Sequence, residues 1–173
     1  MLYGTTGRIL RVDLGAGTAT SEMVDESIIM DYLGGTTLGV KYLYDEVAPS
    51  VNWSDPENKV YVGSGPLGGV RVAGSGTVSI VSRGALNNGI ASTQANGSFG
   101  AYLKYSGFDG ILIEGIASDW QYLYVHDGQA ELRDARQFAG QDTLSVEHRI
   151  KDEMGGSRGS MSVLGIGPAG ENL

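Results

Sequence analysis

The chain has 173 residues, 41% of them hydrophobic and none of them cysteine, which suffices for one domain with a core and excludes disulfide bonds and thiolate metal sites. A net charge of −8 argues against a nucleic-acid partner, and no apolar run approaches the ~20 residues of a membrane span. Because the N-terminus also lacks the apolar core of a signal peptide, we expect a cytoplasmic protein.

The first quarter of the chain predicts a hairpin followed by two helices. Residues 8–14 alternate between apolar and charged side chains, as a half-buried strand does, and residues 18–23 can return beside them. Asp25 is placed to cap a helix that Gly34 and Gly35 end. We expect Thr37 to cap a second helix, which continues to about Val47.

The middle of the chain reads as short strands separated by glycine turns. Strands are predicted at residues 59–63, 77–82 and 111–114, with a turn at 87–89 and a short helix at 99–105. Glycine makes up 28 of the 173 residues, about twice the usual ~7%. This composition favours tight turns between strands over disorder.

The last third predicts a hairpin, a helix and a final strand. Strands 121–126 and 129–134 flank Asp127-Gly128, a dipeptide suited to a type I′ turn. Asp142 is placed to cap a helix that ends near Met154, and residues 160–166 read as a strand. The chain is therefore predicted to be one strand-rich α+β domain with about three helices.

Residues 63–110 form the most glycine-rich part of the chain and allow two interpretations. Either the glycines make only tight turns, or they let the backbone come close to a ligand. Residues 63–68 match G-x-G-x-x-G, but no helix pattern follows, so we interpret the match as a structural turn.

Few side chains are candidates for chemistry. His126 and His148 are expected in solvent, and Glu114, at the end of an apolar strand, is the carboxylate expected to be partly buried. Arg83 and Lys104 flank the glycine-rich stretch and could meet an anion, although exposed cations are usually only solvated. The residues alone therefore indicate a backbone-rich surface without a catalytic set.

Six blocks together resemble the N-terminal domain of the tungsten-containing aldehyde:ferredoxin oxidoreductases. They occur in the family's order and spacing over essentially the whole chain, and they are specific only in combination. The blocks are Y-G-T-T-G-R-I-L-R-V-D-L (3–14), L-G-G-T-T-L-G-V-K-Y-L-Y-D-E-V (33–47), D-P-E-N-K-V-Y-V-G-S-G-P-L-G-G (55–69), F-G-A-Y-L-K-Y-S-G-F-D-G-I-L-I-E-G (99–115), Y-L-Y-V-H-D-G-Q-A-E-L-R-D-A (122–135) and I-G-P-A-G-E-N-L (166–173).

The resemblance implies a fold and a cofactor. In this family two twisted β-sheets form a saddle under a tungsten bis-pterin cofactor, and a magnesium ion bridges the two pterin phosphates. The parent enzyme oxidises an aldehyde to a carboxylic acid and passes the electrons through a [4Fe–4S] cluster to ferredoxin. Residues 1–173 would then be the cofactor-cradling domain, with the remaining domains of the enzyme as partners.

The resemblance also implies contact positions, and the chain departs from the family at three of them. The cofactor-binding residues would be Gly76, Thr77, Gln94, Ala95, Asn96 and Gly97. The backbone carbonyl of Gln94, where the family usually has Asn, would hold magnesium. Thr36 and Thr77 stand where the family usually has Arg. Loss of two arginines removes charge-assisted phosphate contacts, which leaves open whether the cofactor is held differently or is absent.

Two other functions remain open at this stage. One is the tungsten subunit of a larger reductase that acts on aromatic thioesters. The other is a non-catalytic scaffold that has lost the cofactor, which the two threonines favour slightly. The family's cluster-binding cysteines, its acid/base residues and its second pterin-binding half lie beyond the position of Leu173. We therefore expect residues 1–173, as a domain or as part of a split enzyme, to be inactive alone.

Overall fold

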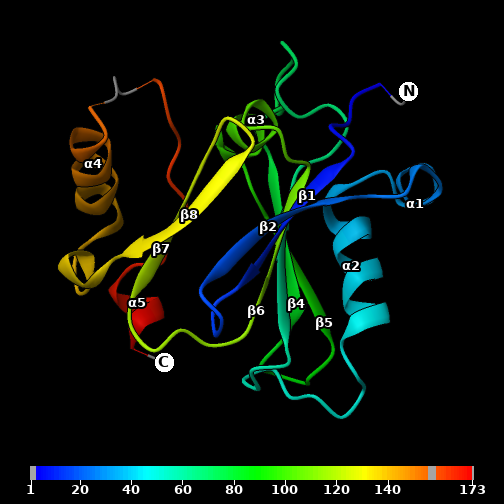
Figure 1. The fold of residues 1–173 in the computed structure, drawn as a ribbon, viewed down its shortest axis with the longest axis horizontal. Coiled ribbons are helices and arrows are strands. Elements are labelled where there is room, and N and C mark those ends of the chain that lie inside the picture. Colours follow the sequence, from blue (N-terminus) through cyan, green and yellow to red (C-terminus); the bar gives the residue numbers. More distant parts are fainter. Residues whose placement is uncertain (1–2, 156–158, 173) are drawn as a thin grey trace.

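The computed structural model describes residues 3–155 and 159–172, which form two β-sheets flanked by helices (Figure 1). The strands are β1 (Arg8–Asp13), β2 (Thr18–Met23), β3 (Lys59–Gly63), β4 (Val78–Arg83), β5 (Ile90–Ala95), β6 (Gly110–Glu114), β7 (Gln121–His126) and β8 (Gln129–Asp134). The helices are α1 (Glu26–Tyr32), α2 (Gly35–Glu46), α3 (Phe99–Tyr105), the 3₁₀ turn η1 (Arg136–Phe138), α4 (Thr143–Glu153) and α5 (Pro168–Glu171).

The larger sheet has six strands in the order β2-β1-β6-β3-β4-β5, and the smaller is the hairpin β7–β8. Within the larger sheet β1 runs parallel to β6, and every other neighbouring pair is antiparallel. The α+β class with two sheets is therefore confirmed. The described residues form more helices than the three or so expected, because α5 and the 3₁₀ turn are too short to predict.

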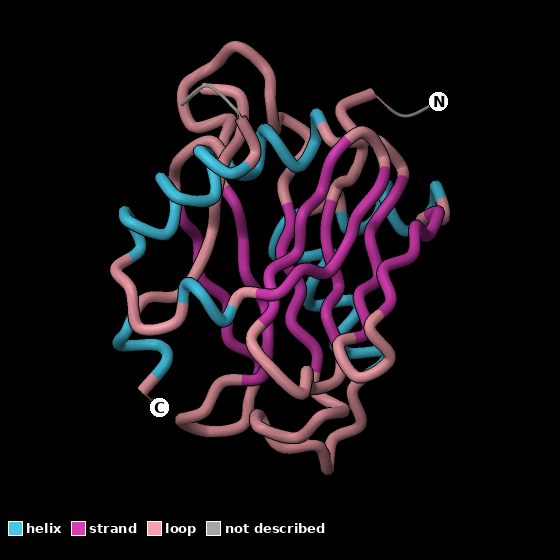
Figure 2. Tube along the Cα trace, turned by 60° about the vertical axis from the view of Figure 1, so that its left-hand side comes forward, coloured by secondary structure: helices cyan, strands magenta, loops and turns pink. Residues whose placement is uncertain are grey.

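The large sheet is covered on both faces, and Figures 1 and 2 show α2 on the opposite side from the hairpin and α4. Alternation along β1 sends Ile9 toward the helical side and Leu10 and Val12 toward the hairpin. One core includes Ile9, Leu38, Tyr42, Leu43, Tyr61, Val81 and Leu112. The other includes Leu10, Val12, Val62, Val78, Leu103, Phe108 and Ile111.

Several local predictions are confirmed. The Asp25 side chain accepts a hydrogen bond from the Ser27 N–H, 2.8 Å away, and Asp142 accepts two in the same way at the start of α4. Asp127 and Gly128 both have positive φ, as a type I′ turn requires. Side-chain caps and hairpin turns are set by neighbouring residues, which is why the sequence predicts them.

Three local expectations need correction. Residues 160–166 are not a strand, because no strand of the described chain pairs with them and a strand needs a hydrogen-bonded neighbour. Helix α2 begins at Gly35 with Gly34 as its N-cap, whereas Thr37 lies in its first turn and donates to the Gly34 carbonyl oxygen at 3.0 Å. Strand β5 was not predicted, because all six of its residues are exposed and show no apolar alternation.

None of the helices in the described part of the chain is long and apolar enough to cross a membrane.

Candidate functional site

Three glycine-rich turns and the end of β5 surround a hollow of about 390 Å³ at one end of the large sheet. We call it the glycine hollow. Its lining residues are Gly34, Gly35, Thr36, Thr37, Ser64, Gly65, Pro66, Leu67, Gly68, Gly74, Ser75, Thr77, Ser79 and Gln94. They come from three regions that are far apart in the sequence, namely the α1–α2 junction, the segment from the turn after β3 to the start of β4, and the outer strand β5.

Backbone hydrogen bonds hold these turns together. The Gly35 N–H donates to the Ser64 carbonyl oxygen at 3.0 Å, which joins the start of α2 to the turn after β3. The Gly69 N–H donates to the Ser75 carbonyl oxygen at 2.9 Å and closes the loop before β4. The walls of the hollow are therefore fixed mainly by main-chain contacts.

The six residues predicted to bind the cofactor lie side by side at the β4–β5 end of the sheet. Ala95 and Gln94 pair with Val78 and Ser79 across the two strands. The Thr77 hydroxyl lies 2.8 Å from Asn96 Oδ1. Of the six, Thr77 and Gln94 line the hollow, whereas Gly76, Ala95, Asn96 and Gly97 are not among its lining residues.

Glycine is required at two positions next to this end of the hollow. A Cβ on Gly76 would lie 1.7 Å from the Gly97 carbonyl oxygen, and a Cβ on Gly100 would lie 2.4 Å from the Thr77 carbonyl oxygen. The Gly100 N–H, in the first turn of α3, donates to the Gly76 carbonyl oxygen at 3.1 Å. These glycines let α3 pack directly on the backbone that carries Thr77.

The sequence reasoning missed most of the other wall of the hollow. Gly34 and Gly35 were interpreted as a helix stop, and residues 63–68 as an accidental motif and a structural turn. That turn does not open a helix, as expected, but Ser64 to Gly68 line the hollow. Thr36 had been noted only as a departure from the family pattern. Glycines recur in the sequence both at 34–35 and at 63–68, but only the fold shows that these two segments face each other.

The glycine hollow is uncharged and is lined partly by hydroxyl groups. Among the residues that line it, six carry hydroxyl groups, one is an amide, and none is charged. The hydroxyl oxygens of Thr36 and Ser64 are buried and find no hydrogen-bond partner among the described residues. An added Cβ at Gly65 or Gly74 would meet nothing within 4 Å, so bare backbone faces open space there. These features suit a ligand with several hydrogen-bonding groups that approaches the main chain closely.

The two cations considered for an anion, Lys104 and Arg83, are not among the residues that line the hollow. Lys104 pairs with Asp109 at 2.6 Å, and both side chains are buried. Burial alone would raise the pKa of Asp109, but hydrogen bonds from Lys104, Thr5 and the Thr6 backbone outweigh it and lower the pKa. Arg83 donates to two backbone carbonyl oxygens. Both cations therefore support the fold, and neither is free for an anion.

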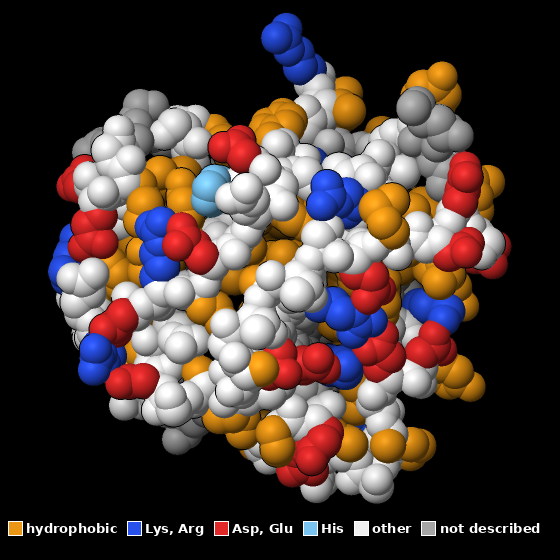
Figure 3. Space-filling view, in the orientation of Figure 1, with side chains coloured by type: hydrophobic (Ala, Val, Ile, Leu, Met, Phe, Trp, Pro, Cys, Tyr) orange, Lys and Arg blue, Asp and Glu red, His pale blue; other side chains and the backbone are white. Residues whose placement is uncertain are grey.

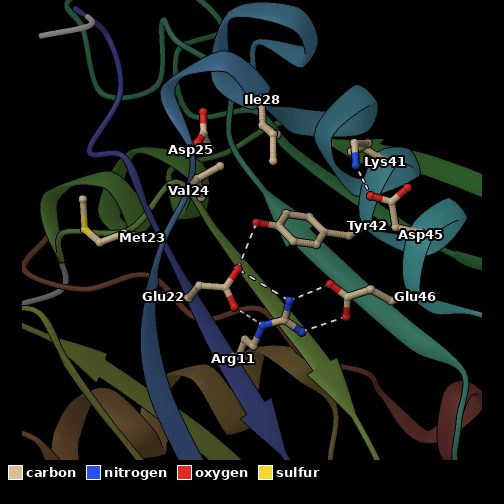
Figure 4. A pocket seen from close by; sticks show the side chains of 10 residues that line it. All are labelled: Arg11, Glu22, Met23, Val24, Asp25, Ile28, Lys41, Tyr42, Asp45 and Glu46. Atoms are coloured by element: carbon tan, nitrogen blue, oxygen red, sulfur yellow. Dashed lines mark hydrogen bonds and ion pairs between the residues drawn. The ribbon is translucent and has the colours of Figure 1, made fainter.

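A second, smaller hollow of about 290 Å³ lies between β2 and α2 and contains a cluster of charges (Figure 4). Arg11 donates to both oxygens of Glu46, at 2.8 and 2.6 Å, and also pairs with Glu22. Lys59 donates to Glu46 at 2.8 Å and also pairs with Glu114, so Glu114 is the partly buried carboxylate that was expected.

Every charge in this cluster has a partner, which indicates a structural role. The hydrogen bond from Arg11, opposed by burial and reinforced by the one from Lys59, lowers the pKa of Glu46 to about 2. On the face shown in Figure 3, acidic and basic side chains are interspersed over α2 and its surroundings. The cluster ties α2 to β1, β2 and β3.

The described residues contain no group of three or more His, Cys, Asp or Glu side chains that could hold a metal ion. His126 stacks on Tyr124 with ring centroids 4.7 Å apart and lies at the hairpin end, away from the residues that line the glycine hollow.

The chain is thus an α+β domain with two sheets and a hollow that offers backbone and hydroxyl groups. The family model described as "Aldehyde ferredoxin oxidoreductase, N-terminal domain" matches residues 9–173. The chain belongs to this family, which confirms the resemblance read from the sequence.

Curated relatives match almost the whole chain. The tungsten-containing aldehyde ferredoxin oxidoreductase of Pyrococcus abyssi is 37% identical over 171 residues, which are 99% of this chain and 28% of the relative. The WOR-like subunit of the aliphatic sulfonate oxidoreductase of Pyrococcus furiosus is 30% identical over 184 residues, 99% of this chain and 29% of the relative. The chain thus spans less than a third of the length of these relatives.

A solved structure shares the fold. In the active-site complex BamBC of benzoyl coenzyme A reductase, solved with 1,5-dienoyl-CoA, one chain superimposes with a TM-score of 0.88 and 30% identity. The match covers 91% of this chain and 24% of that chain.

Proposed function

We propose that residues 1–173 form the cofactor-cradling N-terminal domain of a tungsten-containing oxidoreductase that converts aldehydes to carboxylic acids. The observation that carries this proposal is the family match over residues 9–173, which includes every residue that lines the glycine hollow. The curated relatives with 35–37% identity are named as tungsten-containing aldehyde ferredoxin oxidoreductases. The activity requires the remaining domains or subunits of the enzyme.

In this proposal the glycine hollow holds one side of a tungsten bis-pterin cofactor. Thr77, just before β4, and Gln94, in β5, contact it, with Gly76, Ala95, Asn96 and Gly97 shaping the backbone around them. The Gln94 carbonyl oxygen is proposed as a magnesium ligand, because Mg²⁺ prefers oxygen donors. When bound, the tungsten centre supplies the two-electron chemistry. A [4Fe–4S] cluster outside this chain and ferredoxin in the cytoplasm would receive the electrons.

Two observations support the two alternative functions, a reductase subunit and a scaffold without cofactor. The fold match to benzoyl coenzyme A reductase favours the subunit of an aromatic thioester reductase. The uncharged lining of the hollow, with Thr36 and Thr77 where the family usually has Arg, favours a scaffold without cofactor. The buried hydroxyl groups of Thr36 and Ser64, which have no hydrogen-bond partner among the described residues, count against the scaffold, because buried hydroxyl groups normally have one.

The test is expression of the complete gene under anaerobic conditions with tungstate, followed by measurement of tungsten and pterin per folded chain. We expect stoichiometric tungsten and pterin, with aldehyde-dependent reduction of ferredoxin. A folded full-length protein without pterin would refute the cofactor-binding proposal. Bound pterin together with reduction of an aromatic thioester and no oxidation of aldehydes would instead support the reductase alternative.

A further inference from the structure

The segment between α4 and α5 has an unpaired main chain. Residues 161–166 run without a turn or a bend and belong to neither sheet. Within the described chain, none of their N–H and C=O groups is hydrogen-bonded to the backbone of another residue. Main-chain groups are normally paired in folded proteins, and a straight run of unpaired ones has the properties of an open sheet edge. We call residues 161–166 the open segment.

The open segment, M-S-V-L-G-I, also has the composition of a strand. It contains four large apolar side chains and no charge. Met161 and Val163 are half-buried, whereas Leu164 and Ile166 are 39% and 56% exposed. Side chains two residues apart in an extended chain point to the same side, so Leu164 and Ile166 form one exposed apolar face. The open segment therefore leaves both a main-chain edge and an apolar face without cover.

Contacts at both ends hold the open segment in place. The Ser162 hydroxyl lies 3.0 Å from the hydroxyl of Ser98, the residue just before α3. Beyond the other end, Glu171 in α5 accepts a hydrogen bond from the Gly140 N–H at 2.7 Å. Figure 1 shows α5 and the C-terminus on the side of the large sheet that carries the hairpin. A segment that is already held loses less conformational entropy when a partner pairs with it.

The small sheet on the same side of the domain also has unpaired edges. Strands β7 and β8 are hydrogen-bonded only to each other, so each of them has one open edge. A two-stranded sheet is marginal by itself, and this one is supported by side chains that pack against the core of the large sheet. This side of the domain thus offers more strand edges than the described chain can pair.

The polypeptide that follows residue 173 is the partner that these observations favour. The matching family model describes an N-terminal domain, and the match covers 28% of the Pyrococcus abyssi relative, so most of such an enzyme follows the matched part. Because α5 comes directly after the open segment, the following polypeptide starts close to it, and a short connection costs little loop-closure entropy. A second copy would instead bring another net charge of −8, which opposes association.

We propose that the open segment is a docking edge for a β-strand from the polypeptide that follows residue 173. Its main-chain N–H and C=O groups form ladder hydrogen bonds with that strand, and apolar side chains of that strand cover Leu164 and Ile166. Residues 161–166 then become a strand in the complete enzyme, as their sequence predicts. The docking edge requires no bound cofactor, so a full-length protein without pterin would refute the proposed function and leave this inference intact.

The first experiment is amide hydrogen exchange of the full-length protein. Each amide of residues 161–166 is compared with its rate in an unfolded peptide of the same sequence. We expect exchange at alternate amides to be slowed about 100-fold or more, because only every second N–H points toward a strand on one side. Exchange of all these amides within about tenfold of the unfolded rate would overturn the proposal.

The second experiment identifies the partner. The full-length protein carries the photoreactive residue p-benzoylphenylalanine in place of Leu164, and the irradiated product is digested and analysed by mass spectrometry. We expect a cross-link within one polypeptide, from position 164 to a peptide that lies beyond residue 173. A product of twice the mass would show that a second copy covers this face and would overturn the assignment of the partner. Irradiation without any cross-link would show that the face is uncovered.

Substitutions test the apolar cover in the full-length protein. Ile166→Lys should shorten the half-life of the folded protein at elevated temperature about tenfold, since it places a charge beneath the docked strand. Tyr44→Lys, at an 81% exposed position of α2, is the matched control and should leave the half-life unchanged. If Ile166→Lys prevents folding, Ile166→Ala replaces it, with a smaller loss expected. Equal half-lives of the Ile166 variant and the unmodified protein would contradict the docking edge.

Discussion

Replacement of Glu46 by glutamine is expected to destabilise the domain in a pH-dependent way. Glu46 lies near the C-terminal end of α2 and accepts two hydrogen bonds from Arg11 and one from Lys59. Glutamine has nearly the same shape but no charge, so it leaves both cations with one carboxylate partner each, Glu22 and Glu114. The loss should therefore be electrostatic and not a loss of packing.

The magnitude follows from the pKa of Glu46. A fall from the ordinary 4.5 to about 2 corresponds to at most about 3 kcal/mol of stabilisation. The carboxylate is 26% exposed, so solvent screening reduces this, and we expect Glu46→Gln to cost about 2 kcal/mol at pH 7. Because the folded-state pKa is the lower one, this stabilisation is complete above pH 4.5 and is lost as the pH falls toward 2.

The assay is urea and thermal unfolding of both proteins between pH 7 and pH 2.5. At pH 7 the melting temperature of the variant should be lower by about 4–8 °C, a difference that shrinks below pH 4.5. Asp45→Asn is the control, because its i,i+4 pair with Lys41 is more exposed and should contribute less than about 0.5 kcal/mol. A stability difference between Glu46→Gln and the unmodified chain that stays constant over this pH range would refute the reasoning.

Three further substitutions test the packing of the fold by urea unfolding. Tyr61→Phe should leave stability unchanged or raise it by about 1 kcal/mol, because the buried Tyr61 hydroxyl has no partner in the described chain, and a loss above 1 kcal/mol would reveal a missed one. Gly39→Ala should cost about 2 kcal/mol, since its Cβ would lie 2.6 Å from Tyr61 and 2.8 Å from Val81, and a neutral result would mean that α2 can move off the sheet. Lys104→Met should cost about 3 kcal/mol by leaving buried Asp109 without a cation, whereas a cost below 1 kcal/mol would show that its backbone donors suffice.

The sequence predicted those parts of the fold that depend on neighbouring residues. The caps at Asp25 and Asp142 and the turn at Asp127-Gly128 need only a few adjacent side chains and backbone groups. Strands with an apolar alternation, such as β1, were also predicted from the sequence, although β1 contributes to a core on each face of the sheet. The family blocks added the two-sheet architecture, which the fold match confirms.

The tertiary structure alone decided what depends on distant segments. Strand β5 has no apolar pattern and exists because β4 lies beside it, whereas residues 160–166 have a strand-like pattern but no paired strand in the described chain. In the same way, the sequence indicates the glycine-rich segments 34–37, 64–68 and 74–77 only as separate turns. The hydrogen bond from the Gly35 N–H to Ser64 joins the first two turns, the one from the Gly69 N–H to Ser75 closes the loop before β4, and together the three turns line one uncharged hollow. A local pattern shows that a turn forms, but only the packed chain determines which turns face each other across a hollow.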